Sequence, residues 1–134
     1  MNITSYSDLL HVARSQAEQQ RLLFTFVQAE LPNDAKPSER ERFAARQGGV
    51  LSPVMCVDKH ADELSSFENL VEESRATGAH WDIVFVTSMS GRNGQAPTAS
   101  EAEAPLRTMV ESIKNGQLGK FLAFNREGEL VQFH

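Results

Sequence analysis

The chain has 134 residues, of which 40% are hydrophobic and 23% are charged, as in an ordinary single globular domain. Its net charge of −5 argues against nucleic-acid binding, because that binding needs basic residues that neutralise phosphates. The single cysteine excludes an internal disulfide, and no apolar run approaches the roughly 20 residues that a membrane span needs. The first residues do not resemble a signal peptide, so we expect a cytoplasmic, soluble protein without metal or cofactor.

The first third of the chain alternates helix and strand patterns. Ser5 or Ser7 can cap a first helix. The segment Leu22–Val27 is apolar at nearly every position, which is typical of a central strand that is covered on both faces. A serine and a glutamate three residues apart at 38–41 predict a capping box, and the short helix that it opens should end near 48–49.

A strand and a helix follow. The strand is expected from Val50 to Val57 and contains Pro53, which cannot donate to a sheet ladder. Pro53 therefore indicates an edge strand, a bulge, or a strand that begins only at residue 54. A second capping box at Ser65–Glu68 predicts a helix that stops at Gly78.

The fold is organised around a strand, a loop and a helix between residues 81 and 116. Trp81–Thr87 reads as a buried strand, and Ser88–Pro97 is a loop of turn-forming residues. In the helix that follows, apolar residues lie at the i, i+3, i+4, i+7 spacing of one face: Leu106, Met109, Val110 and Ile113. Because Pro105 lacks the N–H of a regular helical residue, we expect this helix to start near Ala104.

Two short apolar segments, Phe121–Phe124 and Glu129–Phe133, surround a glycine-bearing turn and predict a C-terminal β-hairpin. The whole order is α-β-α-β-α-β-α-β-β. This alternation favours a single α/β domain with a mixed five-stranded sheet, in which parallel pairs are joined by crossovers and an antiparallel pair stands at the end.

Five segments resemble a small proteobacterial family of one-domain proteins that are often labelled "ribonucleotide reductase subunit alpha". They are Pro53–Lys59, Leu70–Arg75, Ala104–Leu106, Phe121–Phe124 and Gln132–Phe133. The resemblance covers most of the chain and implies no catalytic residues. Ribonucleotide reduction by this polypeptide is excluded, because that reaction needs a radical-bearing cysteine together with a redox pair and the chain has one cysteine.

The most specific site hypothesis is a binding site for a small anion. If the strands that end near residues 57 and 87 are parallel neighbours, polar residues that follow them meet at one edge of the sheet. They are Asp58, Lys59, His60, Ser88, Ser90, Arg92 and Asn93. The loop leads into a helix N-terminus, which favours negative charge, and Gly91 and Gly94 would let the backbone approach the anion. A solvated connector made of turn residues is the alternative interpretation.

Two further features have competing interpretations. Cys56 could act as a nucleophile with His60 as its base, but the apolar residues around it favour a buried, inert cysteine. The hairpin at 121–133 carries more apolar residues than a terminal hairpin usually needs, so it could pair with a partner chain or a second copy. Ordinary packing against the helices is the alternative.

The first functional hypothesis is therefore a non-enzymatic protein that acts through a protein partner or as a homodimer, with the 121–133 hairpin as the contact. The alternative is a protein that binds or transforms a small anionic ligand, with Arg92, Asn93 and the following helix N-terminus as the anion site.

Overall fold

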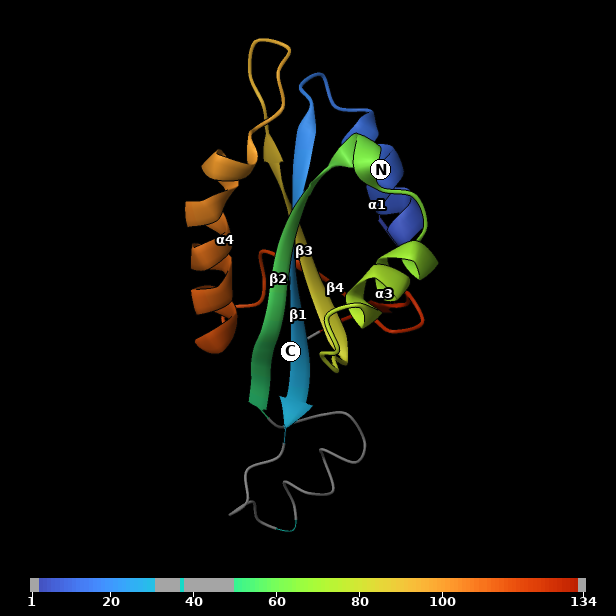
Figure 1. Ribbon diagram of the computed structural model, residues 1–134, viewed down its shortest axis with the longest axis vertical. Helices are drawn as coiled ribbons and strands as arrows, with labels where there is room; N and C mark the ends of the chain where they lie inside the picture. Colours follow the sequence, from blue (N-terminus) through green and yellow to red (C-terminus); the bar gives the residue numbers. More distant parts are fainter. Residues whose placement is uncertain (1–2, 31–36, 38–49, 133–134) are drawn as a thin grey trace.

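The computed structural model describes residues 3–30, 37 and 50–132, and these form one sheet flanked by helices (Figure 1). The elements in chain order are α1 (Tyr6–Arg14), β1 (Gln20–Glu30), β2 (Val50–His60), a 3-10 turn η1 (Ala61–Glu63), α3 (Phe67–Arg75), β3 (Ile83–Ser90), α4 (Ala99–Lys114), β4 (Leu122–Asn125) and β5 (Leu130–Val131). The helix predicted at 38–49 lies outside the described residues.

The strand order is β2-β1-β3-β4-β5, and every neighbouring pair is antiparallel. The predicted single α/β domain with five strands, flanking helices and a C-terminal hairpin is confirmed. The predicted parallel pairs are wrong. β2 and β3 do run in the same direction, but β1 lies between them, and the segment 115–121 separates α4 from an antiparallel β4. Alternating helix and strand patterns do not reveal these reversals.

The long strand β2 is an edge of the sheet and lies at the front of Figure 1. Its pairing with β1 shifts register, since Phe26 lies opposite Met55 and Val27 lies opposite Pro53, which leaves Val54 as an extra residue. Pro53 suggested three alternatives, and two of them, an edge strand and a bulge, are confirmed. A proline and a bulge discourage a further strand from pairing with an edge.

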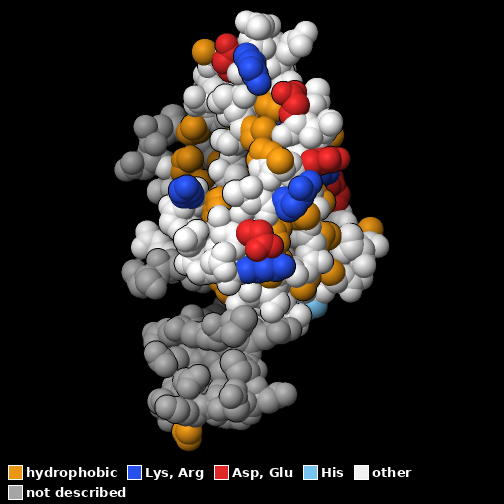
Figure 2. Space-filling model, turned by 90° about the vertical axis from the view of Figure 1, so that its left-hand side faces the viewer, with side chains coloured by type: hydrophobic (Ala, Val, Ile, Leu, Met, Phe, Trp, Pro, Cys, Tyr) orange, Lys and Arg blue, Asp and Glu red, His pale blue; other side chains and the backbone are white. Residues whose placement is uncertain are grey.

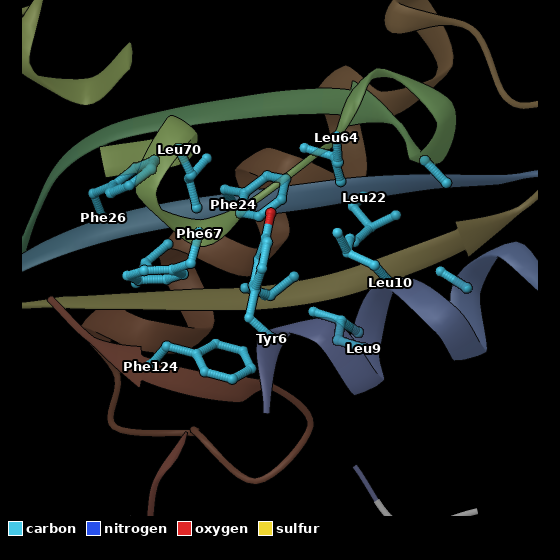
Figure 3. Close-up of a cluster of buried hydrophobic side chains, with 14 of the residues drawn as sticks. Tyr6, Leu9, Leu10, Leu22, Phe24, Phe26, Leu64, Phe67, Leu70 and Phe124 are labelled. Carbon is cyan, nitrogen blue, oxygen red and sulfur yellow. The ribbon is translucent and has the colours of Figure 1, made fainter. Parts of the chain in front are cut away.

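The main core lies between the sheet and the helices α1 and α3 (Figure 3). Aromatic rings meet edge to face in it: Tyr6 lies 5.2 Å from Phe67 and 5.8 Å from Phe124, and Phe26 lies 5.0 Å from Trp81, between ring centroids. Such contacts add about 0.5–1.5 kcal/mol per pair to the free energy that burial itself supplies. This core fixes α1 and α3 against one face of the sheet.

The opposite face carries a second core, to which α4 contributes Ala102, Met109 and Ile113. α4 lies mainly over β1 and β2. Over β3 and β4 the cover comes from the segment after the helix, whose Phe121 packs edge to face on Phe85 at 6.4 Å. Figure 2, which views the α4 side, shows small apolar patches scattered between charged side chains.

α4 begins at Ala99, five residues before the predicted start at Ala104. Thr98 and Glu101 form the capping box, and the helix continues through Pro105. The proline removes one hydrogen bond of the helical ladder. The helix forms because its cap and its buried apolar face outweigh that loss, which is why the proline rule predicted the wrong start.

The helix α3 follows its prediction closely. Its N-cap is Ser66 and not Ser65, since the Ser66 hydroxyl accepts the hydrogen bond from the backbone N–H of Asn69. The chain turns away at Gly78, which has φ +75° as a left-handed terminator requires. Among the described residues, no helix combines the length and the apolar character of a membrane span.

Candidate functional site

The ends of β2 and β3 lie at the same end of the sheet, one on each side of the start of β1. His60 at the end of β2 pairs with Arg21, and Ser90 at the end of β3 pairs with Gln20. The two predicted halves of the site are therefore brought to one end of the molecule. However, β1 occupies the space between them, so the predicted crevice between adjacent parallel strands does not form.

Asp58 and Lys59 are engaged in ion pairs with other parts of the protein. The Asp58 carboxylate accepts hydrogen bonds from the Arg21 guanidinium at 2.6 Å, and both side chains are largely buried. Lys59 points to the opposite face of the sheet and pairs with Glu73 of α3. Neither side chain lies beside Arg92, so these two residues stabilise the fold rather than complete an anion site.

His60 is a capping residue. Its Nδ1 accepts a hydrogen bond from the backbone N–H of Asp62 at 3.0 Å, and its Nε2 lies 2.9 Å from Gln19 Oε1. The Gln19 side chain in turn donates to the carbonyl of Gly94 at 3.0 Å. Among the described residues, Gln19 links His60 to the loop of the predicted site.

The loop after β3 contains a tight β-hairpin, which rises above the sheet in Figure 1. Arg92 and Gln95 exchange two backbone hydrogen bonds of 3.0 Å. Asn93 and Gly94 form the two-residue turn with φ values of 55° and 76°, as a type I′ turn requires. The Asn-Gly dipeptide is the sequence signal for this hairpin, and the sequence-based interpretation treated it only as part of a loop.

Gly91 is required by the packing of this hairpin. A Cβ atom at Gly91 would lie 1.9 Å from the carbonyl oxygen of Gln95. The Gly91 N–H also donates to the Gln19 carbonyl at 2.8 Å. Gly91 was expected to let the backbone approach an anion. In the structure, its lack of a side chain lets the backbone of Gln95 approach instead.

A polar hollow of about 300 Å³ lies between this hairpin and the start of α4. Its polar lining residues are Ser90, Arg92, Asn93, Gln95, Thr98 and Glu101. The structure therefore brings together three of the predicted site residues, while Asp58, Lys59 and His60 are not part of this lining. Gln95, Thr98 and Glu101 were not predicted as site residues, because Pro105 placed the expected helix start at Ala104, after the capping box at 98–101.

The N-terminus of α4 already holds a carboxylate of the protein. Glu101 Oε1 accepts the backbone N–H of Thr98 at 3.0 Å, and Thr98 Oγ1 accepts the N–H of Glu101 at 3.1 Å. These hydrogen bonds lower the pKa of Glu101 below its ordinary value, and the positive charge of Arg92 lowers that pKa further. A free anion at this helix end would have to compete with Glu101.

Cys56 is exposed, so the prediction that it is buried is wrong. It lies on the same face of β2 as Val54, whose side chain is 38% exposed. Apolar neighbours in the sequence suggested a core position, but this face of an edge strand is only partly covered. Both ring nitrogens of His60 are engaged elsewhere, so His60 is not a base for the thiol.

An apolar hollow of about 260 Å³ lies beside the C-terminal hairpin. Its apolar lining residues are Leu118, Phe121, Leu122, Ala123, Leu130 and Val131. Phe124, by contrast, is fully buried in the main core. The hairpin thus contributes to both cores and still leaves several half-buried apolar side chains around one hollow.

Within the described ranges, no three or more His, Cys, Asp or Glu side chains are grouped as a metal site would require. Comparisons of the chain with protein-family models, with curated proteins and with solved structures gave no match. The resemblance described under the sequence therefore stays a prediction, and the proposals below depend on geometry alone.

Proposed function

We propose that the protein acts by associating with another protein chain rather than by catalysis, and that the hairpin β4–β5 provides the contact. The partner proposed is a second copy of the chain. The observation that carries this proposal is the apolar hollow beside the hairpin. Apolar side chains that stay partly exposed to water favour contact with another chain.

The position of the hollow supports a contact through the sheet. β5 is the outer strand on this side. Ser5 forms a bridge with Glu129 directly before it, and no other described strand pairs with the outer edge of Leu130–Val131. Such an edge accepts a further strand through main-chain hydrogen bonds, and a neighbouring pocket accepts the side chains of that strand. Two copies related by a two-fold axis would pair β5 with β5 in this way.

The proposed role is in the cytoplasm. Cys56 is free and exposed, and a thiol in this state persists in a reducing compartment.

Sedimentation velocity over a range of protein concentrations tests the proposal. The expected result for the unmodified chain is a monomer–dimer equilibrium. Val131→Thr keeps the shape of the side chain at the hairpin edge but places a hydroxyl there, so it should weaken the dimer roughly fivefold, which corresponds to about 1 kcal/mol.

Val54→Thr is the matched control, because it makes the same change in the opposite edge strand. It should leave the dimer unchanged. Trp81 fluorescence confirms that both variants are folded, since this buried side chain is the only tryptophan. A strict monomer at every concentration, or equal weakening by both variants, would overturn the proposal.

A further inference from the structure

The polar hollow between the 91–96 hairpin and the start of α4 suggests a second, separate binding site. We propose that this hollow binds a small zwitterion of the size of an amino acid, with Arg92 receiving the carboxylate and Glu101 receiving the ammonium group. This site is independent of the association proposed at the C-terminal hairpin, because the two hollows share no lining residue.

Arg92 supplies the positive wall. It is exposed on the hairpin, where its backbone is held by two hydrogen bonds to Gln95. Its guanidinium makes no hydrogen bond or ion pair with any residue that the structure describes. An arginine in this state can hold a carboxylate through two parallel hydrogen bonds.

Glu101 supplies the negative wall. One of its carboxylate oxygens accepts the Thr98 N–H, which fixes the side chain at the start of α4. A glutamate is ionised at neutral pH even at its ordinary pKa, so the carboxylate can also receive an ammonium group.

Arg92 and Glu101 both line the same hollow. No ion pair within 4.0 Å joins Arg92 to Glu101 among the described residues, although Arg92 lowers the Glu101 pKa and so lies close enough to influence it. A ligand with only a negative charge would be attracted by Arg92 but repelled by Glu101. A ligand with only a positive charge would be attracted by Glu101 but repelled by Arg92. A molecule that carries both charges satisfies both walls.

The size and rigidity of the hollow limit the ligand. Its volume of about 300 Å³ lies at the lower end of the range for small-molecule sites. The wall that carries Arg92 is a tight turn, and the wall that carries Glu101 is a capped helix start. Neither wall needs to fold around the ligand, which lowers the entropy cost of binding.

The test is a titration of the ¹⁵N-labelled full chain, followed by two-dimensional NMR at constant ionic strength. Glycine is the zwitterionic probe, and acetate and methylammonium are the probes with one charge each. The expected result is that glycine shifts the amide signals of residues 91–95 and 98–101 in a saturable way, with at least about tenfold higher affinity than either single-charge probe.

Two variants test which residue binds which charged group of the ligand. Arg92→Gln and Glu101→Gln should each weaken glycine binding at least about tenfold, and glutamine at 101 still completes the capping box. Arg107→Gln removes an exposed arginine that lies on α4 outside the hollow, and it should leave binding unchanged.

Equal affinity for acetate and glycine would show a simple anion site and overturn the proposal. The absence of saturable shifts with glycine, or glycine binding that Glu101→Gln does not weaken, would overturn it as well. None of these results bears on dimer formation through the C-terminal hairpin.

Discussion

The indole Nε1 of Trp81 donates a hydrogen bond of 2.9 Å to the hydroxyl of Ser74, and both side chains are buried. Ser74 Oγ donates in turn to the carbonyl of Val71 at 2.6 Å. Aromatic rings of Phe26 and Phe67 pack against the indole, and the Arg126 guanidinium lies 4.7 Å from the centroid of its ring. Ser74 is the hydrogen-bond partner of the indole N–H. This bond connects the end of α3 to the start of β3.

Ser74→Ala should therefore lower the free energy of unfolding by roughly 1–3 kcal/mol, because it leaves the buried indole N–H without a partner. Urea denaturation followed by Trp81 fluorescence measures the change. Ser100→Ala, at an exposed position of α4, is the control and should stay within about 0.5 kcal/mol of the unmodified chain. Equal stability of the two variants would contradict the role of this hydrogen bond.

Tyr6 predicts how stability depends on alkaline pH. Burial raises the pKa of its phenol well above the ordinary 10.0, and the hydroxyl has no hydrogen-bond partner among the described residues. Above about pH 10 the phenol ionises in the unfolded chain but not in the folded one. This part of the stability is therefore complete below pH 10 and is lost as the pH rises towards the folded pKa, by at most about 1.4 kcal/mol per pH unit.

Tyr6→Phe should remove this alkaline loss and should not destabilise the chain at neutral pH, because the unpaired hydroxyl is what it deletes. Urea denaturation at neutral and alkaline pH compares the two chains. Since Tyr6 is the only tyrosine, phenolate absorbance in the unmodified chain should appear only as the protein unfolds. Phenolate that forms in the folded protein near pH 10 would contradict the burial of this group.

Gly91→Ala should distort or open the 91–96 hairpin. The new methyl group would meet the Gln95 carbonyl oxygen at 1.9 Å, and an overpacked contact of this kind costs typically about 1–3 kcal/mol. Urea denaturation measures the loss, and the amide signals of Arg92 and Gln95 report on the hairpin. Gly119→Ala is the matched control, because a methyl group there meets nothing within 4 Å.

The pKa of Glu101 should rise part of the way towards its ordinary value in Thr98→Ala, because the backbone N–H of residue 98, the larger cause of the shift, remains. The backbone and side-chain hydrogen bonds of Thr98 lower the pKa, and the variant removes the hydroxyl that completes the capping box. Because the pKa is lowered on folding, the matching stability is present at neutral pH and is lost as the pH falls through the folded pKa. NMR titration of the Glu101 side chain checks this, and an unchanged pKa would contradict the capping geometry.

The sequence predicted the elements of this fold better than their arrangement. The predicted strands Leu22–Val27 and Trp81–Thr87 correspond to β1 and β3, two inner strands, although β3 begins at Ile83 and continues to Ser90 into the predicted loop. Their local composition is sufficient because a strand that is buried on both faces needs apolar residues throughout. Strand direction depends instead on the paths of the connections, for which residue type gives no signal.

The candidate site could be predicted only in part for the same reason. Arg92 and Asn93 share a hollow because they are neighbours in one hairpin. Asp58 is neutralised by Arg21, a residue 37 positions away along the chain, and only the register of β1 against β2 places the two side chains together. Glu101 shares the hollow with Arg92 only because α4 begins at Ala99, which the proline rule did not predict.

The two outer strands of the sheet differ in how readily a strand from another molecule can pair with them. β2 carries Pro53, the extra residue Val54 and the charged Lys59 along its length, whereas β5 presents two apolar residues. Growth into a fibre requires that each subunit has two edges that can pair, one for the preceding subunit and one for the following subunit. If two molecules pair through β5 as proposed, neither keeps a second edge that accepts a strand, so assembly is expected to stop at the dimer.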